Sequence, residues 1–204
     1  LKRSLPPGSG RFLRGGVFRD FFAKYPEADR LHKRMTLVSR EVALRGGAEA
    51  GTELYRGQSN DPLWHGVFGG LYLPHLREAS YAHLLRAEKL ALETPDSGWR
   101  IEDYDADGEG EAIIRGSAFS AIVEPRLGGG LAEIGHYALS RNLADVLGRR
   151  REAYHVERES ARSPEGGSIH ELAKTLPGGA RDLFKYDGYE RLSGLDRIYD
   201  PGAE

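Results

Sequence analysis

Polar and aromatic side chains crowd into one short stretch, GQSNDPLWHG at residues 57–66, and an apolar segment follows it. A sugar presents flat C–H faces and a rim of hydroxyl groups. A carbohydrate site therefore needs an aromatic platform beside planar amide and carboxylate groups, and this stretch contains all of these. The candidate sugar-binding residues are Gln58, Asn60, Asp61, Trp64 and His65.

The same residues also fit a purely structural role. Trp64 is then a core residue, Asp61 caps a helical turn, and His65 is a buried imidazole with its hydrogen bonds satisfied. The glycines that follow would let the backbone approach either a ligand or a neighbouring element closely, because glycine has no side chain. Residue chemistry alone leaves both interpretations open.

Acidic residues alternate along a second stretch, DYDADGEGE at residues 103–111. Carboxylates spaced in this way can surround a hard cation, and Ca²⁺ prefers roughly six to eight oxygen ligands. The EF-hand template fails, because the position that needs a bidentate glutamate is Ile114. A shorter calcium loop and a solvated acidic turn both remain open. The candidate metal ligands are Asp103, Asp105, Asp107 and Glu111.

Helical periodicity dominates the first half of the chain. From Pro26 to Val42, apolar residues recur three or four apart, which predicts a helix that the two glycines at 46 and 47 end. A shorter helix is predicted over residues 48–55. A longer helix starts near Pro74, and its apolar stripe is formed by Leu76, Ala79, Tyr81, Leu84, Leu85 and Ala87.

Shorter apolar patterns follow a turn-like segment, TPDSG at residues 94–98. Stretches rich in β-forming and aromatic residues, separated by Gly, Pro or Asp, predict antiparallel strands. The fold class predicted is α+β, with a helical bundle over residues 1–94 and an incomplete, β-sandwich-like domain over residues 99–204. The predicted strands lie at residues 111–116, 117–125, 129–140 and 151–158.

Composition excludes several classes of partner. The 204 residues, 39% of them hydrophobic, suffice for packed cores, and a net charge of -2 gives no field that attracts nucleic acid or an anionic membrane. No apolar run reaches the ~20 residues that a membrane span needs. The lack of cysteine excludes disulfides and thiolate metal sites but leaves the compartment open. We expect a cytoplasmic location, and a native N-terminus outside this sequence.

Longer motifs resemble one family of carbohydrate-active enzymes. The segment YRGQSNDPLWHGVFGGLYLPHLREASYAHLLRAE is similar to a stretch of the α-amylase and 4-α-glucanotransferase branch of glycoside hydrolase family 57. RGGVFRDFFAKYPEADRLHKRM resembles the passage from that family's barrel into its helical bundle. DYDADGEGE, LGRRREAYHVE, SIHELAK and LFKYDGYERLSGLDRIYD resemble pieces of its C-terminal β domain. A departure is Ser59, where the family pattern has cysteine in many members.

The resemblance implies that a distorted (β/α) barrel upstream carries the chemistry, with a glutamate nucleophile and an aspartate general acid. Retaining glycosidases need two such carboxyl groups ~5 Å apart. No position in this chain matches that pair, so we expect no catalytic residue here and no activity from the chain alone. The resemblance also implies that the segment around Trp64 closes the active-site cleft and faces the sugar.

The implied partners are an α-glucan or maltooligosaccharide and the catalytic barrel of the same parent chain. No cofactor is required, and calcium is the metal that the acidic loop would accept. Hydrolysis and transfer share one covalent intermediate, so no residue here distinguishes hydrolase from transferase. Two alternatives stay open, a non-catalytic carbohydrate-binding module and a calcium-stabilised interaction module, and so does a homodimer.

Overall fold

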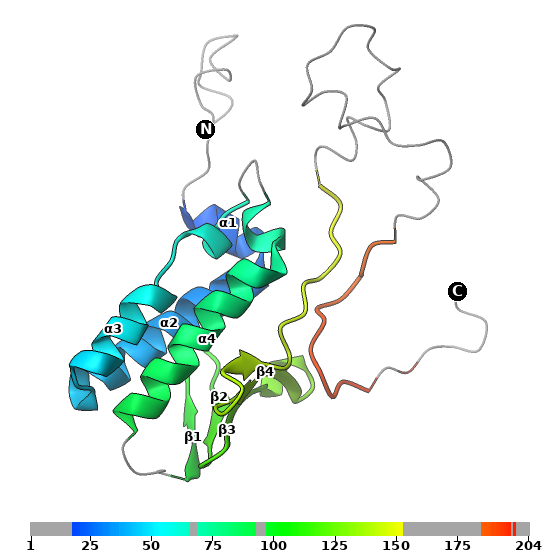
Figure 1. Ribbon diagram of the computed structural model, residues 1–204. Coiled ribbons are helices and arrows are strands. Elements are labelled where there is room, and N and C mark those ends of the chain that lie inside the picture. The colour runs from blue at the N-terminus through cyan, green and yellow to red at the C-terminus, as the bar shows by residue number, and fades with distance from the viewer. Residues whose placement is uncertain (1–17, 66–68, 93–96, 153–184, 197, 199–204) are drawn as a thin grey trace, which may run out of the picture. The chain divides into compact units, whose positions relative to one another are not determined.

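The computed structural model of the chain describes residues 18–65, 69–92, 97–152, 185–196 and 198 (Figure 1). The chain divides into two compact units. The larger unit comprises residues 1–145 and 192–204, and it contains every helix and strand that these described residues form. The smaller unit comprises residues 146–191.

The described residues contain four α-helices, and the last three confirm the helices predicted from periodicity. Proline occupies the first turn of two of them, where its missing N–H is not needed. No helix in this described part is both long and apolar enough to cross a membrane. The helices are α1 (Phe18–Lys24), α2 (Pro26–Arg45), α3 (Ala48–Gly57) and α4 (Pro74–Ala91).

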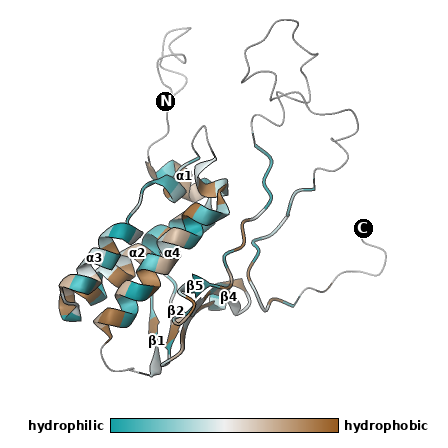
Figure 2. Cartoon of the chain, in the orientation of Figure 1, coloured by the Kyte–Doolittle hydropathy of each residue, from teal (hydrophilic) through white to brown (hydrophobic). Residues whose placement is uncertain are grey.

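An apolar core joins α2, α3 and α4 (Figure 2). α3 and α4 pack closely at Gly57, where a Cβ atom would lie 2.9 Å from the Leu84 side chain. The apolar stripe predicted for α4 is wrong at Ala79, which is exposed. The core consists of Leu31, Val38, Val42, Ala50, Leu54, Leu63, Tyr81, Leu84, Ala87 and Ala91.

Five strands in the described residues form one antiparallel sheet, in which each strand pairs with the next along the chain. The α+β fold class is therefore confirmed. The first and last strands were not predicted, and most of the strand predicted at 151–158 lies outside the described residues. The strands are β1 (Gly98–Glu102), β2 (Glu111–Arg115), β3 (Phe119–Glu124), β4 (Gly130–His136) and β5 (Arg141–Asn142).

Charged groups join one face of the sheet to α2 and α4. The carboxylate of Glu88 on α4 lies 2.6 Å from a guanidinium nitrogen of Arg34 on α2 and 3.0 Å from one of Arg115 on β2. Arg34 also contacts Glu133 of β4 at 2.9 Å, and the Tyr137 hydroxyl donates to Glu88 at 3.0 Å. Burial disfavours charge on Glu88, but the neighbouring arginines outweigh it and lower the pKa of Glu88 to about 2.

The opposite face of the sheet is apolar. Strand register places Trp99 of β1 beside Ile114 of β2, and Ile101 beside Ala112. The side chain of Trp99 is 72% exposed and that of Ile101 is 57% exposed. The face that packs on the helices thus combines buried charges with Ile113 and Ile122, whereas the opposite face exposes large apolar side chains.

A separate ion-pair cluster orders the described part of the smaller unit. The carboxylate of Asp187 accepts a 2.7 Å hydrogen bond from the backbone N–H of Arg149 and also pairs with the guanidinium groups of Arg149 and Arg191. The Arg149 contact lowers the pKa of Asp187.

Candidate functional site

A glycine turn fixes the backbone of the candidate sugar-binding segment. Two 3₁₀ turns, η2 (Asp61–Leu63) and η3 (Gly70–Tyr72), lie between α3 and α4. The N–H of Leu71 donates to the carbonyl oxygen of Trp64 at 2.7 Å. A Cβ atom at Gly70, whose φ is +48°, would lie 2.0 Å from that oxygen, so only glycine fits. The glycine thus serves a close approach between two parts of the same loop.

The indole of Trp64 is anchored on two sides and partly open to solvent. Its ring N–H donates to the side-chain oxygen of Asn60 at 2.6 Å. Its ring centroid lies 5.0 Å from that of Phe18 and 5.7 Å from that of Phe21, both on α1. The residue is 37% exposed, which does not fit a core tryptophan. A fixed indole with a free portion can serve as a stacking platform.

A second group of rings adjoins the first. The imidazole of His65 stacks near Tyr25, with centroids 6.4 Å apart, and meets the Tyr72 ring edge-on at 5.0 Å. Phe21 connects the two groups, because its centroid is 4.4 Å from that of the buried Tyr25. His65 is exposed rather than buried. The ring contacts therefore form one continuous aromatic group from Trp64 to His65.

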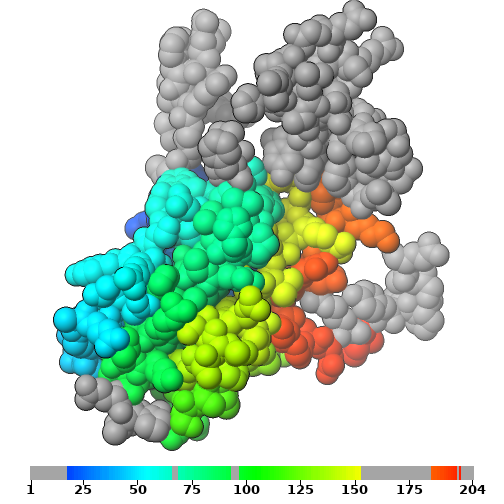
Figure 3. Space-filling view, in the orientation of Figure 1, coloured from blue at the N-terminus to red at the C-terminus, as the bar shows by residue number. Residues whose placement is uncertain are grey.

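The remaining candidate residues offer polar groups at the same loop. Gln58 is exposed at the C-terminal end of α3, which forms part of the surface seen in Figure 3. The hydroxyl of Ser59 donates to the carboxylate of the exposed Asp61 at 3.3 Å. Asn60 uses its amide oxygen to hold Trp64, so a contact of Asn60 with a ligand would have to come from its two N–H donors.

Sequence reasoning missed the contribution of α1. Its aromatic residues Phe18, Phe21 and Phe22 recur three and four apart and continue to Tyr25, a spacing that places them on one helical face. His32 of α2 joins them, at 4.9 Å from Phe22 between centroids, and burial lowers its pKa. The spacing was a usable signal, and the segment was interpreted only through a family resemblance.

The acidic loop brings three of its four predicted ligands together. Carboxylate oxygens of Asp103, Asp105 and Glu111 lie within 4.8 Å of one another. Asp107 instead accepts from the N–H of Glu109 at 2.8 Å and pairs with Arg126 at 2.8 Å. Its role in this conformation is to shape the loop.

Burial disfavours a negative charge on Glu111, the last acidic residue of the loop. Glu111 is 1% exposed and accepts a hydrogen bond from the N–H of Tyr104 at 3.2 Å. Burial and the nearby charge of Asp105 raise the pKa of Glu111 to about 7. Burial and Asp107 likewise raise the pKa of Asp105. A bound cation would relieve this repulsion.

Both halves of the chain match models of one protein family. The middle domain of α-amylase/4-α-glucanotransferase matches residues 16–91, and the C-terminal domain of α-amylase/4-α-glucanotransferase matches residues 103–204. The boundaries 1–94 and 99–204 drawn from the sequence stay a prediction.

Individual relatives agree with these matches. A 4-α-glucanotransferase of Thermococcus kodakarensis is 41% identical over 93% of this chain and 29% of its own length. An α-amylase of Pyrococcus furiosus is 42% identical over 94% of this chain and 28% of its own length. The crystal structure of a 4-α-glucanotransferase from Thermococcus litoralis superposes with a TM-score of 0.72 at 38% identity, covering 88% of this chain and 26% of that one.

This chain spans less than a third of the length of these relatives. The resemblance seen in the motifs is confirmed, since sequence and fold agree over nearly the whole chain. The chain belongs to the α-amylase/4-α-glucanotransferase family, of which it contains the middle and C-terminal domains.

Proposed function

We propose that this chain is the non-barrel part of a retaining enzyme that acts on α-1,4-glucan, and that the segment around Trp64 forms one wall of its sugar-binding cleft. The observation that carries the proposal is the partly exposed indole of Trp64, held by Asn60 and by the rings of α1. The relatives named as α-amylases and 4-α-glucanotransferases support the class of reaction.

The segment would bind and orient the sugar without reacting with it. The apolar face of the Trp64 indole stacks on a glucose ring, while the amides of Asn60 and Gln58 take up hydroxyl groups that would otherwise lose water unpaired. Asp61 and His65 complete the polar rim. The two reacting carboxyl groups come from the barrel of the same parent chain, because glycosidic bond cleavage needs both.

The chain alone is therefore expected to leave maltooligosaccharides unchanged. Product analysis after long incubation tests this expectation. Turnover that co-purifies with the chain and disappears when one of its own carboxylates is replaced would contradict it.

The role of Trp64 is tested in the full-length parent enzyme. We expect Trp64→Ala to lower kcat/KM for oligosaccharides by roughly 10-fold or more, the equivalent of losing one good stacking contact, with a smaller effect on melting temperature. Trp99→Ala is the matched control, because it removes an exposed indole from the sheet. Normal kinetics per titrated active site, together with a large drop in melting temperature, would mean that Trp64 is only structural.

We also propose that the acidic loop binds calcium through Asp103, Asp105 and Glu111, with Asp107 holding the loop in shape. Calcium at a hundredfold excess over its Kd would stabilise the fold by about 2.7 kcal/mol. Thermal scans with calcium and with chelator test this. Asp105→Ala should abolish the difference, while Glu109→Ala, an exposed acid outside the carboxylate cluster, should preserve it. Equal midpoints for the unmodified chain in both buffers would leave a solvated turn.

A further inference from the structure

A buried arginine at the start of α4 joins the candidate sugar-binding loop to the segment that follows the sheet. Arg77 is 5% exposed. One terminal nitrogen of its guanidinium group donates to the backbone carbonyl oxygen of Leu71 in η3 at 2.5 Å. Its Nε donates to the carboxylate of Asp145 at 2.9 Å. One side chain therefore connects the loop between α3 and α4 to a residue 68 positions beyond Arg77.

Leu71 carries this contact on to Trp64. Its side chain is fully buried, and its N–H donates to the carbonyl oxygen of Trp64 at 2.7 Å. The two backbone groups of Leu71 are thus both engaged, the carbonyl oxygen by Arg77 and the N–H by Trp64. A displacement of Leu71 would consequently move the backbone of Trp64.

The end of the sheet holds Asp145 in place. The buried side-chain oxygen of Asn142 on β5 accepts from the N–H of Ile134 at 3.1 Å and from the N–H of Ala144 at 2.9 Å. The N–H of Leu143 donates to the carbonyl oxygen of Ile134 at 2.8 Å. Asp145 therefore follows directly on backbone that is fixed to β4.

We propose that Arg77 is a positioning residue for the sugar-binding site. Anchored by Asp145, it holds Leu71 and, through Leu71, the backbone of Trp64. The inference rests on the proposed role of Trp64 in sugar binding. The chemistry suits arginine, because a planar guanidinium group donates in several fixed directions at once, whereas the ammonium group of lysine is a compact charge on a flexible stem.

The contacts of Arg77 complement those that hold the indole ring. Asn60 and Phe18 act on the ring of Trp64, whereas Leu71 acts on its backbone. A stacking platform must be held in both ways, because a misplacement of about 1 Å, caused far from the chemistry, can lower a rate by about 100-fold.

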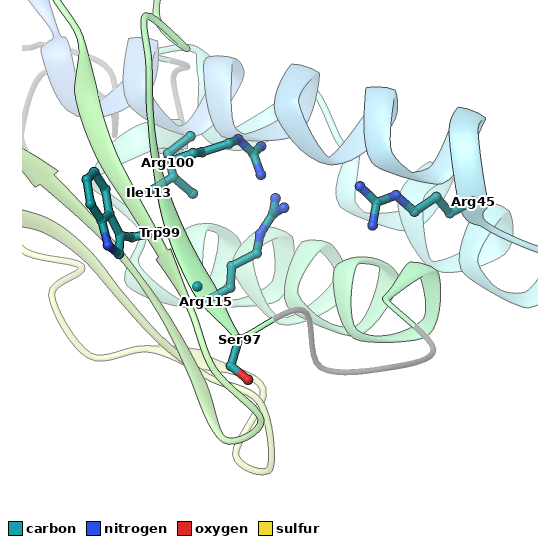
Figure 4. Close-up of a pocket in the computed structure, with 7 residues that line it drawn as sticks. Arg45, Ser97, Trp99, Arg100, Ile113 and Arg115 are labelled. Atoms are coloured by element: carbon teal, nitrogen blue, oxygen red, sulfur yellow. The ribbon is translucent and has the colours of Figure 1, made fainter.

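Tryptophan fluorescence tests the inference on this chain. The sequence contains two tryptophans, and the side chain of Trp99 lies on the side of β1 away from the side chains of Arg100 and Arg115 (Figure 4). Trp99→Phe therefore removes an exposed indole and leaves Trp64 as the one indole of the chain.

In the Trp99→Phe background, we expect Arg77→Lys to raise the acrylamide quenching of Trp64 and to lower its fluorescence anisotropy. Lysine retains the positive charge beside Asp145 but lacks the fork that reaches Asp145 and Leu71 together. The Trp64 backbone should then move more freely.

Arg115→Lys is the matched control. Arg115 is an arginine of similar burial, 6% exposed, but it pairs with Glu41 and Glu88, at 3.1 and 3.0 Å. The same substitution there should lower stability in urea while leaving the quenching and anisotropy of Trp64 unchanged in the folded chain. A loss of stability alone is thereby separated from a loss of positioning.

Asp145→Asn tests the other end of the contact. The amide keeps the shape of the carboxylate and leaves the bond from Arg77 to Leu71 possible. We expect quenching and anisotropy to change in the same direction as for Arg77→Lys, but by less. This variant decides the question if Arg77→Lys does not fold.

Kinetics of the full-length parent enzyme test the link to sugar binding. Arg77→Lys should lower kcat/KM for oligosaccharides by about 3- to 10-fold per titrated active site, through loss of one hydrogen bond on the loop. In a Trp64→Ala background, the same substitution should lower it by less than about twofold, because residues that act through one contact are not additive.

Two results would overturn the inference. One is a change in quenching and anisotropy for Arg77→Lys that is no larger than that for Arg115→Lys. The other is an equal fall in kcat/KM with Trp64 present and with Trp64 replaced. Failure of the proposed function looks different, because Trp64→Ala would then leave kcat/KM unchanged, while the fluorescence would still decide whether Arg77 holds the backbone of Trp64.

Discussion

The two faces of the sheet differ in how they combine charged and apolar residues. The face packed on α2 and α4 buries Glu111, Arg115 and Glu133, each 6% exposed or less. The other face carries Trp99 and Ile101, each more than half exposed. An antiparallel sheet with one covered face ordinarily turns its apolar residues toward the cover.

The difference teaches that the helix–sheet interface adds specific charge pairing to apolar burial, since Ile113 and Ile122 also pack there with Leu37 of α2. Charges this deeply buried are tolerated only when each has a partner, and Arg34, Glu88, Glu133 and Arg115 satisfy one another. Such a network contributes little net stability but loses much when one member is removed. The register between the helices and the strands is consequently fixed by a few specific contacts.

The largest effect is expected for Glu88→Ala. This substitution leaves Arg34 and Arg115 buried with an excess of positive charge, which should lower the free energy of unfolding by about 3–5 kcal/mol. Glu78→Ala on the same helix is the control, because its pair with Arg141 is exposed and should contribute less than about 1 kcal/mol. Urea unfolding of both variants measures the difference.

Similar losses of unfolding free energy for Glu88→Ala and Glu78→Ala would contradict the comparison, because burial of the ion network would then not matter. A third variant, Glu88→Gln, separates charge from packing. The amide retains the shape and one acceptor oxygen, so a loss close to that of Glu88→Ala would assign the effect to charge rather than to packing.

A smaller effect, with an opposite dependence on pH, is expected for Glu111. The folded pKa of Glu88 is depressed to about 2, so its contribution is present above pH 4.5 and is lost as the pH falls toward 2. The folded pKa of Glu111 is raised to about 7, so its contribution is present below pH 4.5 and is lost as the pH rises through 7.

In metal-free buffer, Glu111→Gln should therefore raise the free energy of unfolding at pH 8 by about 1–3 kcal/mol. It should also reduce the fall in this free energy between pH 5 and pH 8. Melting temperatures across that range, with chelator present, measure both. Equal slopes for the variant and the unmodified chain would show that another group titrates there.

Strands β2, β3 and β4 could be predicted from sequence, but the arrangement of their faces could not. The β-forming residues of EAIIR predict β2, yet they do not show that Arg115 is buried, because its partner Glu88 lies 27 residues away on a helix. β1 was missed because its five residues follow directly on a turn-like segment. The α2 helix was correct because its own apolar spacing defines it.

In the candidate sites too, contacts within one loop could be predicted, whereas contacts between distant elements could not. Residue types within one loop were enough to single out Trp64 and Asn60, which form a hydrogen bond. The support of Trp64 by Phe18 was not foreseen, because it depends on how α1 packs. Asp107 was predicted to be a metal ligand together with Asp103. In this structure its carboxylate forms an ion pair with Arg126, which lies in the turn after β3.

The smallest effect is expected on the apolar face, for Trp99→Ala. Because the indole is 72% exposed, its removal uncovers little surface, and the loss is limited to the cross-strand contact with Ile114, worth roughly 0.2–1 kcal/mol. Ile113→Ala, one residue away but directed to the buried face at 2% exposure, should cost about 2–5 kcal/mol. Urea unfolding of both variants measures the two losses of unfolding free energy within one pair of neighbouring strands. A loss for Trp99→Ala that equals the loss for Ile113→Ala would mean that the apolar face is as well packed as the charged one, and the distinction between the two faces would then fail.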